Sequence, residues 1–452
     1  MTTEPATLIE QPQEAPAAPV RAPSFRGFLF AWFGQVVSTL GSGLTSFALG
    51  VWLFQRSHST TQWTLLVFSY SFATVLTLPF AGALVDRWDR RIVLLLSNLG
   101  AATGSLLLAG LAWSGRLEPW EAYAAAMITA SFNSFQMPAF NATVPLLVPK
   151  DQLGRAAGLT QLGMAIPGIL GPILAGVLVV AIKLRGILLV DIVSFAFALF
   201  TLLVVRFPKV PQSAESRAAR GSLGREISFG WKYLRERPGL MALLYTFAGV
   251  NFCLGMVQAV LPPMILGFSS PTALGTVLMV AGLGMAAGAI VMSVWGGPKR
   301  RVRGMFLFLS FVAALLFLAG FKPSVPLVGA AAFLFMFCFP IINGCGAAIW
   351  QRKIAPDVLG RTFSLQRVIA TAGLPVAALL AGPLAEYVFG PLLVPGGALA
   401  SSLGRVIGVG TGRGTALLFI LLAVLTYVAL ALGWSNPRLR NVEDELPDAI
   451  PG

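Results

Sequence analysis

Residues 82–91 read GALVDRWDRR and carry five charged side chains. On either side lies an apolar segment, near 62–84 and 91–113. Each segment is long enough to cross the hydrocarbon core of a bilayer, which takes about 20 helical residues. A tight charged turn between two such segments is typical of a short loop at one membrane face. We therefore expect residues 82–91 to connect two membrane-spanning helices.

The composition of the whole chain agrees with a membrane protein. Of its 452 residues, 56% are apolar and 11% are charged, whereas soluble domains carry about 25% charged residues. The net charge of +14 would suit a nucleic-acid partner, but membrane proteins concentrate Lys and Arg in cytoplasmic loops, which explains the excess better. We therefore expect membrane lipids, and no nucleic acid, around this chain.

Twelve apolar segments follow one another, each ending at charged residues or at Pro and Gly. They lie near 27–55, 62–84, 91–113, 119–142, 154–182, 186–206, 239–266, 272–296, 303–321, 326–350, 363–389 and 414–435. The polar stretch 207–238 separates two sets of six and has the spacing of an amphipathic helix on the inner membrane surface. We predict an all-α polytopic membrane protein with a six-helix bundle at 25–206 and a second at 239–436. Tails at 1–24 and 437–452 flank the bundles.

The basic residues predict the orientation. Seven of the 32 Lys and Arg residues fall in the loops of one face. They are Arg56, Arg116, Lys183, Arg185, Lys322, Arg405 and Arg413. The other 25 fall in the tails, the linker and the loops of the opposite face. Because Lys and Arg concentrate on the cytoplasmic side, we expect both termini to be cytoplasmic.

The two halves also share a short repeat. The stretch DQLGR at 151–155 opens the fifth apolar segment, and DVLGR at 357–361 opens the eleventh. Weak internal similarity of this kind is typical of transporters whose six-helix halves are related by an axis along the membrane normal. The repeat therefore favours two pseudo-symmetric bundles.

The charged stretch resembles the Gly-x-x-x-Asp-Arg-x-Gly-Arg-Lys/Arg loop of the major facilitator superfamily of transporters. The resemblance implies a gating role for Gly82, Asp86, Arg87, Arg90 and Arg91. In such a gate, Asp86 can face the N-terminus of a neighbouring helix, whose dipole favours an anion. Asp89 replaces the usual Gly, and we expect the turn to persist because Asp tolerates left-handed backbone geometry. The alternative is an ordinary basic loop.

A second stretch, GILGPILAG at 168–176, resembles the antiporter motif of drug exporters within that superfamily. Its residues of interest are Gly168, Gly171, Pro172 and Gly176. Spaced glycines let two helices approach closely, and a proline inside a helix removes a backbone donor and bends the helix. The motif predicts a pliable fifth helix, with plain packing of small residues as the alternative.

The same resemblance implies a central path lined by the first, fourth, seventh and tenth helices. These segments carry Gln35, Ser38, Asn133, Gln136, Asn251, Gln258 and Asn343. A neutral amide in lipid needs a hydrogen-bond partner and so faces the protein interior. Together with aromatic residues and Met, these side chains would form an apolar pocket with a few orienting polar groups. The alternative is that the amides only tie helices together.

Further stretches resemble one branch of the superfamily, the bacterial macrolide efflux proteins and the enterobactin exporter. They lie at 34–52, 138–149 and 438–448. This resemblance implies a monomeric exporter of amphipathic small molecules in the bacterial cell membrane, driven by proton antiport. A lipid or lysophospholipid flippase, or a solute importer, of the same superfamily is the alternative.

Four carboxylates are candidates for proton coupling, because ionisable groups at membrane depth are often functional. They are Glu118, Glu121, Asp191 and Glu386. All four are expected toward the outer face, in contact with solvent. The basic residue that many drug/proton antiporters carry in the fourth helix has no counterpart here, so proton coupling rests on the family resemblance.

The residues give little support for a catalytic site, a metal site or a cofactor site. The chain has one His and three Cys, and the cysteines lie inside apolar runs without a CxxC pair. A membrane enzyme needs clustered His, Cys or acidic residues at one face. We therefore expect no catalytic site, metal or cofactor.

Overall fold

In the computed structural model the described residues are 25–205, 207, 231–354, 356–410 and 412–445. These residues form helices and turns, with no strand among them, so the predicted all-α fold is confirmed. The tail at 1–24 and most of the linker, including the start of its amphipathic helix, lie outside the described residues.

Six long helices precede the linker. They are α1 (Phe25–Ser57), α2 (Thr60–Arg87), α3 (Arg90–Ser114), α4 (Pro119–Leu147), α5 (Leu153–Ala181) and α6 (Lys183–Val204). Local signals set their ends. The Ser59 side chain accepts a hydrogen bond from the Gln62 N–H and caps α2, as Ser does at helix starts. Gly115 ends α3 with φ +71°, a left-handed conformation that glycine adopts at little cost.

Six more long helices follow. They are α9 (Pro238–Leu266), α10 (Pro271–Trp295), α11 (Arg301–Phe321), α12 (Val325–Lys353), α13 (Pro356–Pro383) and α15 (Arg413–Ser435). A π-helical turn, η2 (Leu384–Phe389), continues α13. Short helices complete the chain: η1 (Lys150–Gln152), η3 (Pro391–Leu393), α14 (Gly404–Ile407), α16 (Pro437–Arg440) and α17 (Val442–Glu445). Several helices begin at Pro, whose fixed φ suits the first helical turn.

Within the described residues, eleven helices are long and apolar enough to cross a membrane. The remaining long helix, α4, is more polar because it carries Asn133, Gln136 and Asn141. It packs against α2 and α3, between helices that span, and so completes a set of twelve. The twelve-helix prediction is confirmed.

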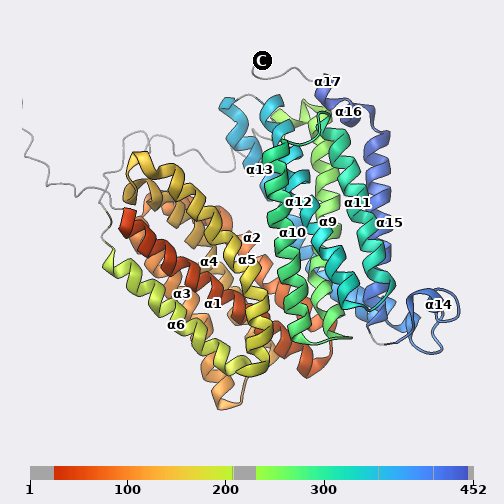
Figure 1. Ribbon diagram of the computed structural model, residues 1–452, viewed down its shortest axis with the longest axis horizontal. Coiled ribbons are helices and arrows are strands. Elements are labelled where there is room, and N and C mark those ends of the chain that lie inside the picture. Colours follow the sequence, from red (N-terminus) through yellow and green to blue (C-terminus); the bar gives the residue numbers. More distant parts are fainter. Residues whose placement is uncertain (1–24, 206, 208–230, 355, 411, 446–452) are drawn as a thin grey trace, which may run out of the picture.

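Figure 1 shows the twelve helices in two groups: α1–α6 (the N bundle) and α9–α13 with α15 (the C bundle). The groups diverge toward the end that carries α16 and α17, and converge at the opposite end. We call the first end the tail face, where Arg87 and Trp295 lie. The second is the far face, where Ser57, Leu266 and Lys322 lie.

The hydrophobic core agrees with this divergence. The largest buried cluster fills the C bundle, and it also includes Val51, Phe54 and Trp63 from the far-face part of the N bundle. The remaining N-bundle clusters contain no C-bundle residue. The two bundles therefore share a hydrophobic core near the far face.

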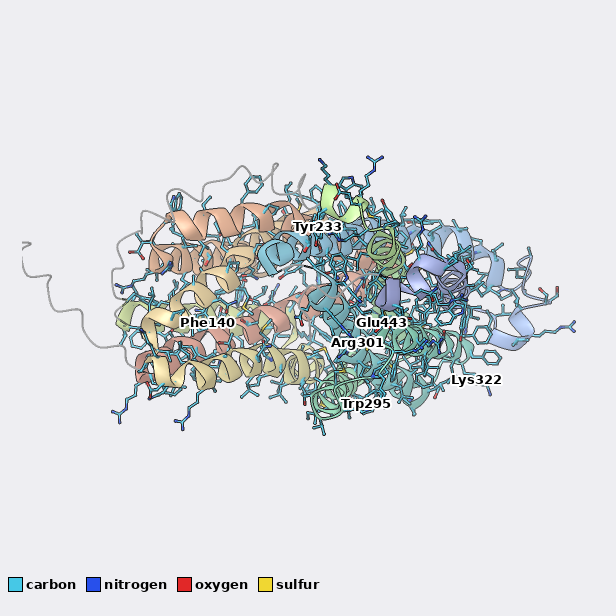
Figure 2. All side chains as sticks on the ribbon, turned by 90° about the horizontal axis from the view of Figure 1, so that it is seen from above. Phe140, Tyr233, Trp295, Arg301, Lys322 and Glu443 are labelled. Atoms are coloured by element: carbon cyan, nitrogen blue, oxygen red, sulfur yellow. The ribbon has the colours of Figure 1, made fainter. Side chains whose placement is uncertain are left out.

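The start of the segment predicted as a C-terminal tail packs on the C bundle. Leu439 and Val442 are fully buried. The Glu443 carboxylate accepts hydrogen bonds from the backbone N–H groups of Arg301 at 3.1 Å and Val302 at 3.0 Å (Figure 2). Those amides open α11, where an anion satisfies donors that lack a partner within the helix. Glu443 thus caps α11 at the tail face.

Candidate substrate cavity and gating elements

A cavity of about 760 Å³ lies within the N bundle. Its described lining residues all come from α1–α6. It runs from Trp32 and Phe140, toward the tail face, to Trp63 near the far face. A Cβ on Gly50 would lie 2.6 Å from the Trp63 ring, so Gly50 lets this ring lie close against α1. The size and mixed lining suit a small-molecule site.

Four buried polar atoms on the cavity wall have no hydrogen-bond partner among the described residues. They are Gln35 Nε2, Trp63 Nε1, Asn133 Oδ1 and Gln136 Nε2. A buried polar atom without a partner costs about 1–3 kcal/mol. Each of these atoms is covered by neighbouring groups although its residue lines the cavity, so the four residues are candidates for contacts to a bound molecule.

The predicted cavity residues separate into two groups. Gln35, Asn133 and Gln136 line the cavity. Ser38 is buried in α1 without reaching the wall. The C-bundle residues are Asn251, Gln258 and Asn343; they do not line this cavity, and the Asn343 amide donates to Phe339 O within its own helix. A role for Ser38 and these three residues in the substrate path stays a prediction.

Sequence reasoning missed the aromatic residues of the wall. Trp32 Nε1 donates to Leu159 O at 2.8 Å and ties α1 to α5, whereas Trp63, also on the wall, has a buried Nε1 without a partner among the described residues. Tyr70 also lines the wall. From the sequence, a Trp in an apolar segment can face either the lipid or the protein interior. Only the packing of the neighbouring helices shows which of the two it faces.

Asp191 on α6 is the carboxylate of the cavity wall. It is 1% exposed and lies among hydroxyl groups. Its Oδ2 accepts from Ser105 Oγ on α3 at 2.6 Å and from Thr45 Oγ1 on α1 at 2.9 Å. Its Oδ1 has two longer contacts of 3.5 Å, to Ser42 Oγ and Ser194 Oγ.

The expectation that Asp191 contacts solvent at the outer face is wrong. It lies eight residues into α6, about 12 Å along the axis at 1.5 Å per residue, closer to the middle of the helix than to its end. The helix begins at Lys183, earlier than the predicted 186, and the hydroxyls that surround the carboxylate come mostly from other helices.

Two other carboxylates act at the start of α4. Glu121 Oε2 accepts from the Glu118 N–H at 2.8 Å, an arrangement that closes the first helical turn. Glu118 also pairs with Arg56 at 3.1 Å, and both side chains are about half exposed. Neither carboxylate lines the cavity; Glu121 closes the first turn of α4, and Glu118 forms an exposed ion pair.

Glu386 joins the two bundles near the far face. Its Oε2 accepts from Ser59 Oγ and from the Thr61 N–H, both at 2.8 Å. The π-helical turn η2 carries Glu386, and Ser59 and Thr61 begin α2. A carboxylate there satisfies an N-terminal amide and interacts favourably with the helix dipole. Glu386 therefore caps a helix of the opposite bundle.

The antiporter-like motif lies where the bundles cross. A Cβ on Gly176 would come within 2.7 Å of Pro271 O, and one on Gly275 would meet Pro172 O. Thr272 Oγ1 donates to Gly176 O at 3.2 Å, which joins α10 to α5. A Cβ on Gly171 would meet no atom within 4 Å, and Gly168 lines the cavity. The motif thus supplies close contact between bundles, while bending of α5 stays a prediction.

The charged stretch forms the end of α2 and the start of α3. Gly82, Asp86 and Arg87 lie in the last turns of α2, and their side chains lie outside the described part. Asp89 was expected in a left-handed turn; this is wrong, because it is extended with φ −61° and its side chain accepts from Arg91 N, capping α3. Arg90 is the first residue of α3.

Arg91 binds within its own bundle. Its guanidinium donates to Leu203 O at 2.9 Å, at the end of α6, and lies 5.8 Å from the Phe207 ring centre. A cation there is favoured by the C-terminal end of the helix dipole. The gating role assigned to Arg91 and to the rest of this stretch stays a prediction.

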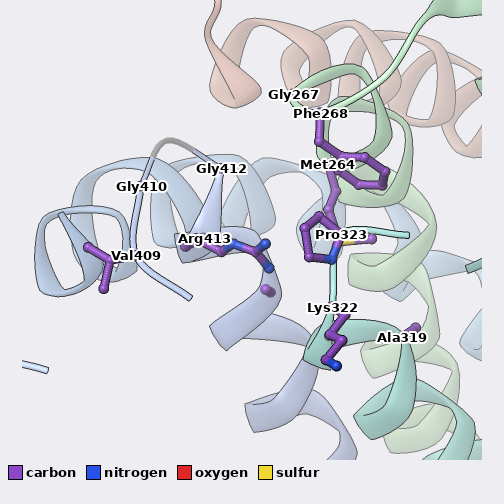
Figure 3. Close-up of a pocket in the computed structure, with 12 residues that line it drawn as sticks. Met264, Gly267, Phe268, Ala319, Lys322, Pro323, Val409, Gly410, Gly412 and Arg413 are labelled. Carbon is purple, nitrogen blue, oxygen red and sulfur yellow. The ribbon is translucent and has the colours of Figure 1, made fainter. Parts of the chain in front are cut away.

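A smaller cavity of about 240 Å³ lies at the far face of the C bundle. Lys322, after α11, and Arg413, at the start of α15, are basic residues of its wall. In Figure 3 the Arg413 side chain extends toward Pro323 and Met264. This cavity sits at helix ends, apart from the cavity of the N bundle.

The family is settled by comparison with known proteins. A model described as Major Facilitator Superfamily matches residues 31–378. The chain belongs to the Major Facilitator Superfamily. It is therefore a transporter with a fold of many membrane-spanning helices, and the predicted family is confirmed.

Relatives within the Major Facilitator Superfamily carry exporter names. Macrolide efflux protein A of Streptococcus pyogenes is 26% identical over 370 residues, covering 80% of this chain and 90% of that protein. Enterobactin exporter EntS of Salmonella typhi is 26% identical over 397 residues, covering 85% of this chain and 90% of that protein.

Among solved structures, a bacterial homolog of the human lysosomal transporter Spinster, in an inward-facing and unoccupied conformation, matches with a TM-score of 0.69. The sequence identity is 14%, and the match covers 93% of this chain and 98% of that chain. This likeness shows that the two proteins share the fold.

Proposed function

We propose that this protein exports amphipathic small molecules across a bacterial cell membrane by alternating access, as a proton-coupled monomer with both termini in the cytoplasm. The observation that carries the proposal is the cavity of the N bundle, with its four unpaired polar atoms. A cavity of about 760 Å³ with a mixed apolar and polar lining has the size and composition of a small-molecule site.

The lining indicates the substrate class. Aromatic and aliphatic side chains, among them Trp32, Leu66 and Phe140, supply most of the wall. The unpaired atoms of Gln35, Trp63 and Gln136 are N–H donors as placed. Such a site suits an apolar molecule with several oxygen acceptors. The exporter names of the two relatives support this class.

The bundle contacts indicate the transport state. With the tail face in the cytoplasm, the bundles are separated on the inside and joined on the outside. The outer closure consists of the α5–α10 crossing at Gly176 and Gly275 and the Glu386 cap on α2. Outward opening requires these contacts to break.

The helix pair α2 and α13 has an acidic residue at each end. Glu386, just after α13, caps the start of α2 near the far face. Asp86, near the end of α2, lies at the tail face, where α13 begins at Pro356. The predicted gating role of the charged stretch is kept as part of the proposal, because its loop lies at the tail face, where α13 begins.

Expression in an efflux-deficient bacterium tests the proposal. A panel of macrolides, siderophore-like catechols and amphipathic dyes is assayed with and without a protonophore. We expect raised resistance or reduced accumulation for some panel members, abolished by the protonophore. Headgroup-dependent uptake of labelled lysolipid into spheroplasts, with no change across the panel, would contradict drug export and indicate a flippase.

A further inference from the structure

We infer that Asp191, with the hydroxyls of Ser42, Thr45 and Ser105, is the proton-binding site that drives transport, and that Ser42 connects it to the cavity. The inference rests on the proposed function, because it names the coupling site of the proposed exporter. It separates Asp191 from the other three carboxylates on geometry, since Glu121 and Glu386 accept from N–H groups at helix starts and Glu118 pairs with Arg56.

Asp191 has no cationic partner among the described residues. The charged residues of the helices that surround it lie at the helix ends. On α1 and α3 they are Arg26, Arg56, Arg90 and Arg91, and on α6 they are Lys183 and Arg185. The other titratable side chain of the cavity wall is Tyr70. A carboxylate that is 1% exposed and faced by hydroxyls alone is a group that readily carries a proton.

The two carboxylate oxygens differ. Oδ2 has two short bonds, to Ser105 and Thr45, so its lone pairs are occupied. Oδ1 has only the long contacts to Ser42 and Ser194, and a Cβ on Gly41 would lie 2.9 Å from it. A proton on Oδ1 would have a nearby acceptor in either serine hydroxyl. The proton therefore resides on Oδ1.

The two serines near Oδ1 differ in whether they line the cavity. Ser42 lines the cavity and Ser194 does not; Ser194 is buried and donates to the backbone oxygen of Asp191 at 2.7 Å. Asp191 lines the cavity but is 1% exposed, and of the two serines near Oδ1 only Ser42 lines the cavity, so Ser42 offers the relay for a proton on Oδ1. The protonated carboxyl donates to Ser42 Oγ, and the Ser42 hydroxyl passes its own proton to a water in the cavity. The products are a carboxylate and hydronium, so one proton leaves and no bond other than O–H changes.

Exchange of substrate for proton follows because both bind at the wall of the same cavity. Release of the proton to the inside leaves one negative charge on the wall, which favours a substrate with a cationic or donor group. Protonation from the outside removes the charge and favours substrate release. Substrate and proton thus use the same wall alternately.

Infrared titration of the purified full-length protein in phosphatidylethanolamine–phosphatidylglycerol vesicles tests protonation without any substrate. We expect a carboxylic acid C=O band that titrates in the wild type, is absent in Asp191→Asn, and is shifted in Thr45→Val. A titrating band that persists unchanged in Asp191→Asn would overturn the assignment.

A matched pair of variants tests the route. In vesicles with an imposed pH gradient and radiolabelled erythromycin as probe, we expect Ser42→Ala to slow proton-driven transport at least about tenfold, since a positioned proton-transfer group contributes that much or more. Ser194→Ala removes a hydroxyl at the same distance from Oδ1 and should stay within about twofold. Equal losses in both variants would overturn the route through Ser42.

The exporter proposal and the assignment of Asp191 can be rejected independently of each other. If the wild type moves no panel compound, the exporter proposal fails, and the infrared band still decides whether Asp191 binds a proton. If the wild type is proton-driven but Asp191→Asn retains gradient-driven accumulation, the assignment fails and the exporter proposal stands. Transport driven by a sodium gradient at equal pH would overturn the proton as the ligand of this site.

Discussion

The two bundles have the same helix count and different interiors. The N bundle encloses a cavity of about 760 Å³ with a buried carboxylate and unpaired polar atoms. The C bundle is filled by the largest hydrophobic cluster, and its hollows, about 240 Å³ at the far face and about 420 Å³ at the tail face, lie among helix ends. The difference indicates a division of labour in which one bundle recognises the substrate and the other closes against it.

The side chains that face the interior of each bundle explain why one bundle has a large cavity and the other has a filled core. On α9, Cys253, Met256 and Val257 are buried in the C-bundle core, whereas Gln35, Thr39 and Ser42 on α1 line the cavity of the N bundle. Apolar side chains fill space and gain dispersion contacts. Small and polar side chains leave it open.

The largest effect is expected where the C bundle closes on α5. Gly176→Ala places a Cβ 2.7 Å from Pro271 O, which overpacks the crossing by about 1–3 kcal/mol. The far face should open. Labelling of Thr64→Cys by a membrane-impermeant maleimide measures this, because Thr64 is fully buried and the three native cysteines are buried as well.

The matched control lies in the same motif. Gly171→Ala adds a Cβ that meets no atom within 4 Å, so its labelling should equal that of the parent. Equal opening in both variants would show that the motif acts through flexibility of α5 and not through contact between the bundles.

The next effect concerns recognition by the N bundle. Gln136→Ala removes an unpaired donor from the cavity wall and should weaken substrate binding by about 1–2 kcal/mol, seen as a raised KM for transport. Under this division Gln258→Ala, at an exposed position of the C bundle, should change KM little, whereas the predicted place of Gln258 in the substrate path requires a raised KM. A larger effect at Gln258 would contradict the division between the bundles.

A smaller effect is expected at the cap between bundles. Glu386→Gln keeps the side-chain shape and loses the charge at the start of α2, which costs about 1 kcal/mol. Thr64→Cys should then label several times faster. Tyr387→Phe, at the next residue, which is 65% exposed, serves as the control and should leave the labelling rate unchanged.

The smallest effect is expected at the exposed ion pair of the N bundle. Glu118→Gln breaks the Arg56 contact, and exposed pairs contribute about 0–1 kcal/mol. Thermal stability and proton-driven transport should both change little. A loss of proton coupling in this variant would move the coupling site away from Asp191.

The sequence predicts most of the fold. The apolar segments match the helices within a few residues, because charge and Pro or Gly mark both their ends. The serine at 59 and the glycine at 115 act as caps. At Asp89, the expected backbone geometry was wrong because the residue caps α3 instead of forming a left-handed turn.

The site is only partly predictable. Gln35, Asn133 and Gln136 stand out because an amide in an apolar segment is unusual. The environment of Asp191 cannot be predicted from the sequence, because its partners on α1 and α3 are 146 and 86 residues away in the chain. The cavity of the N bundle results from the packing of six helices, so no single segment of the sequence predicts it.

The contact between Glu443 and α11 has a consequence for how the protein is made. Arg301 at the start of α11 receives its cap from a residue 142 positions later. The start of α11 therefore lacks this cap until Glu443 has been translated. We expect chains released before Glu443 to reach the membrane with an incomplete second bundle, where proteases that survey membrane proteins would find them.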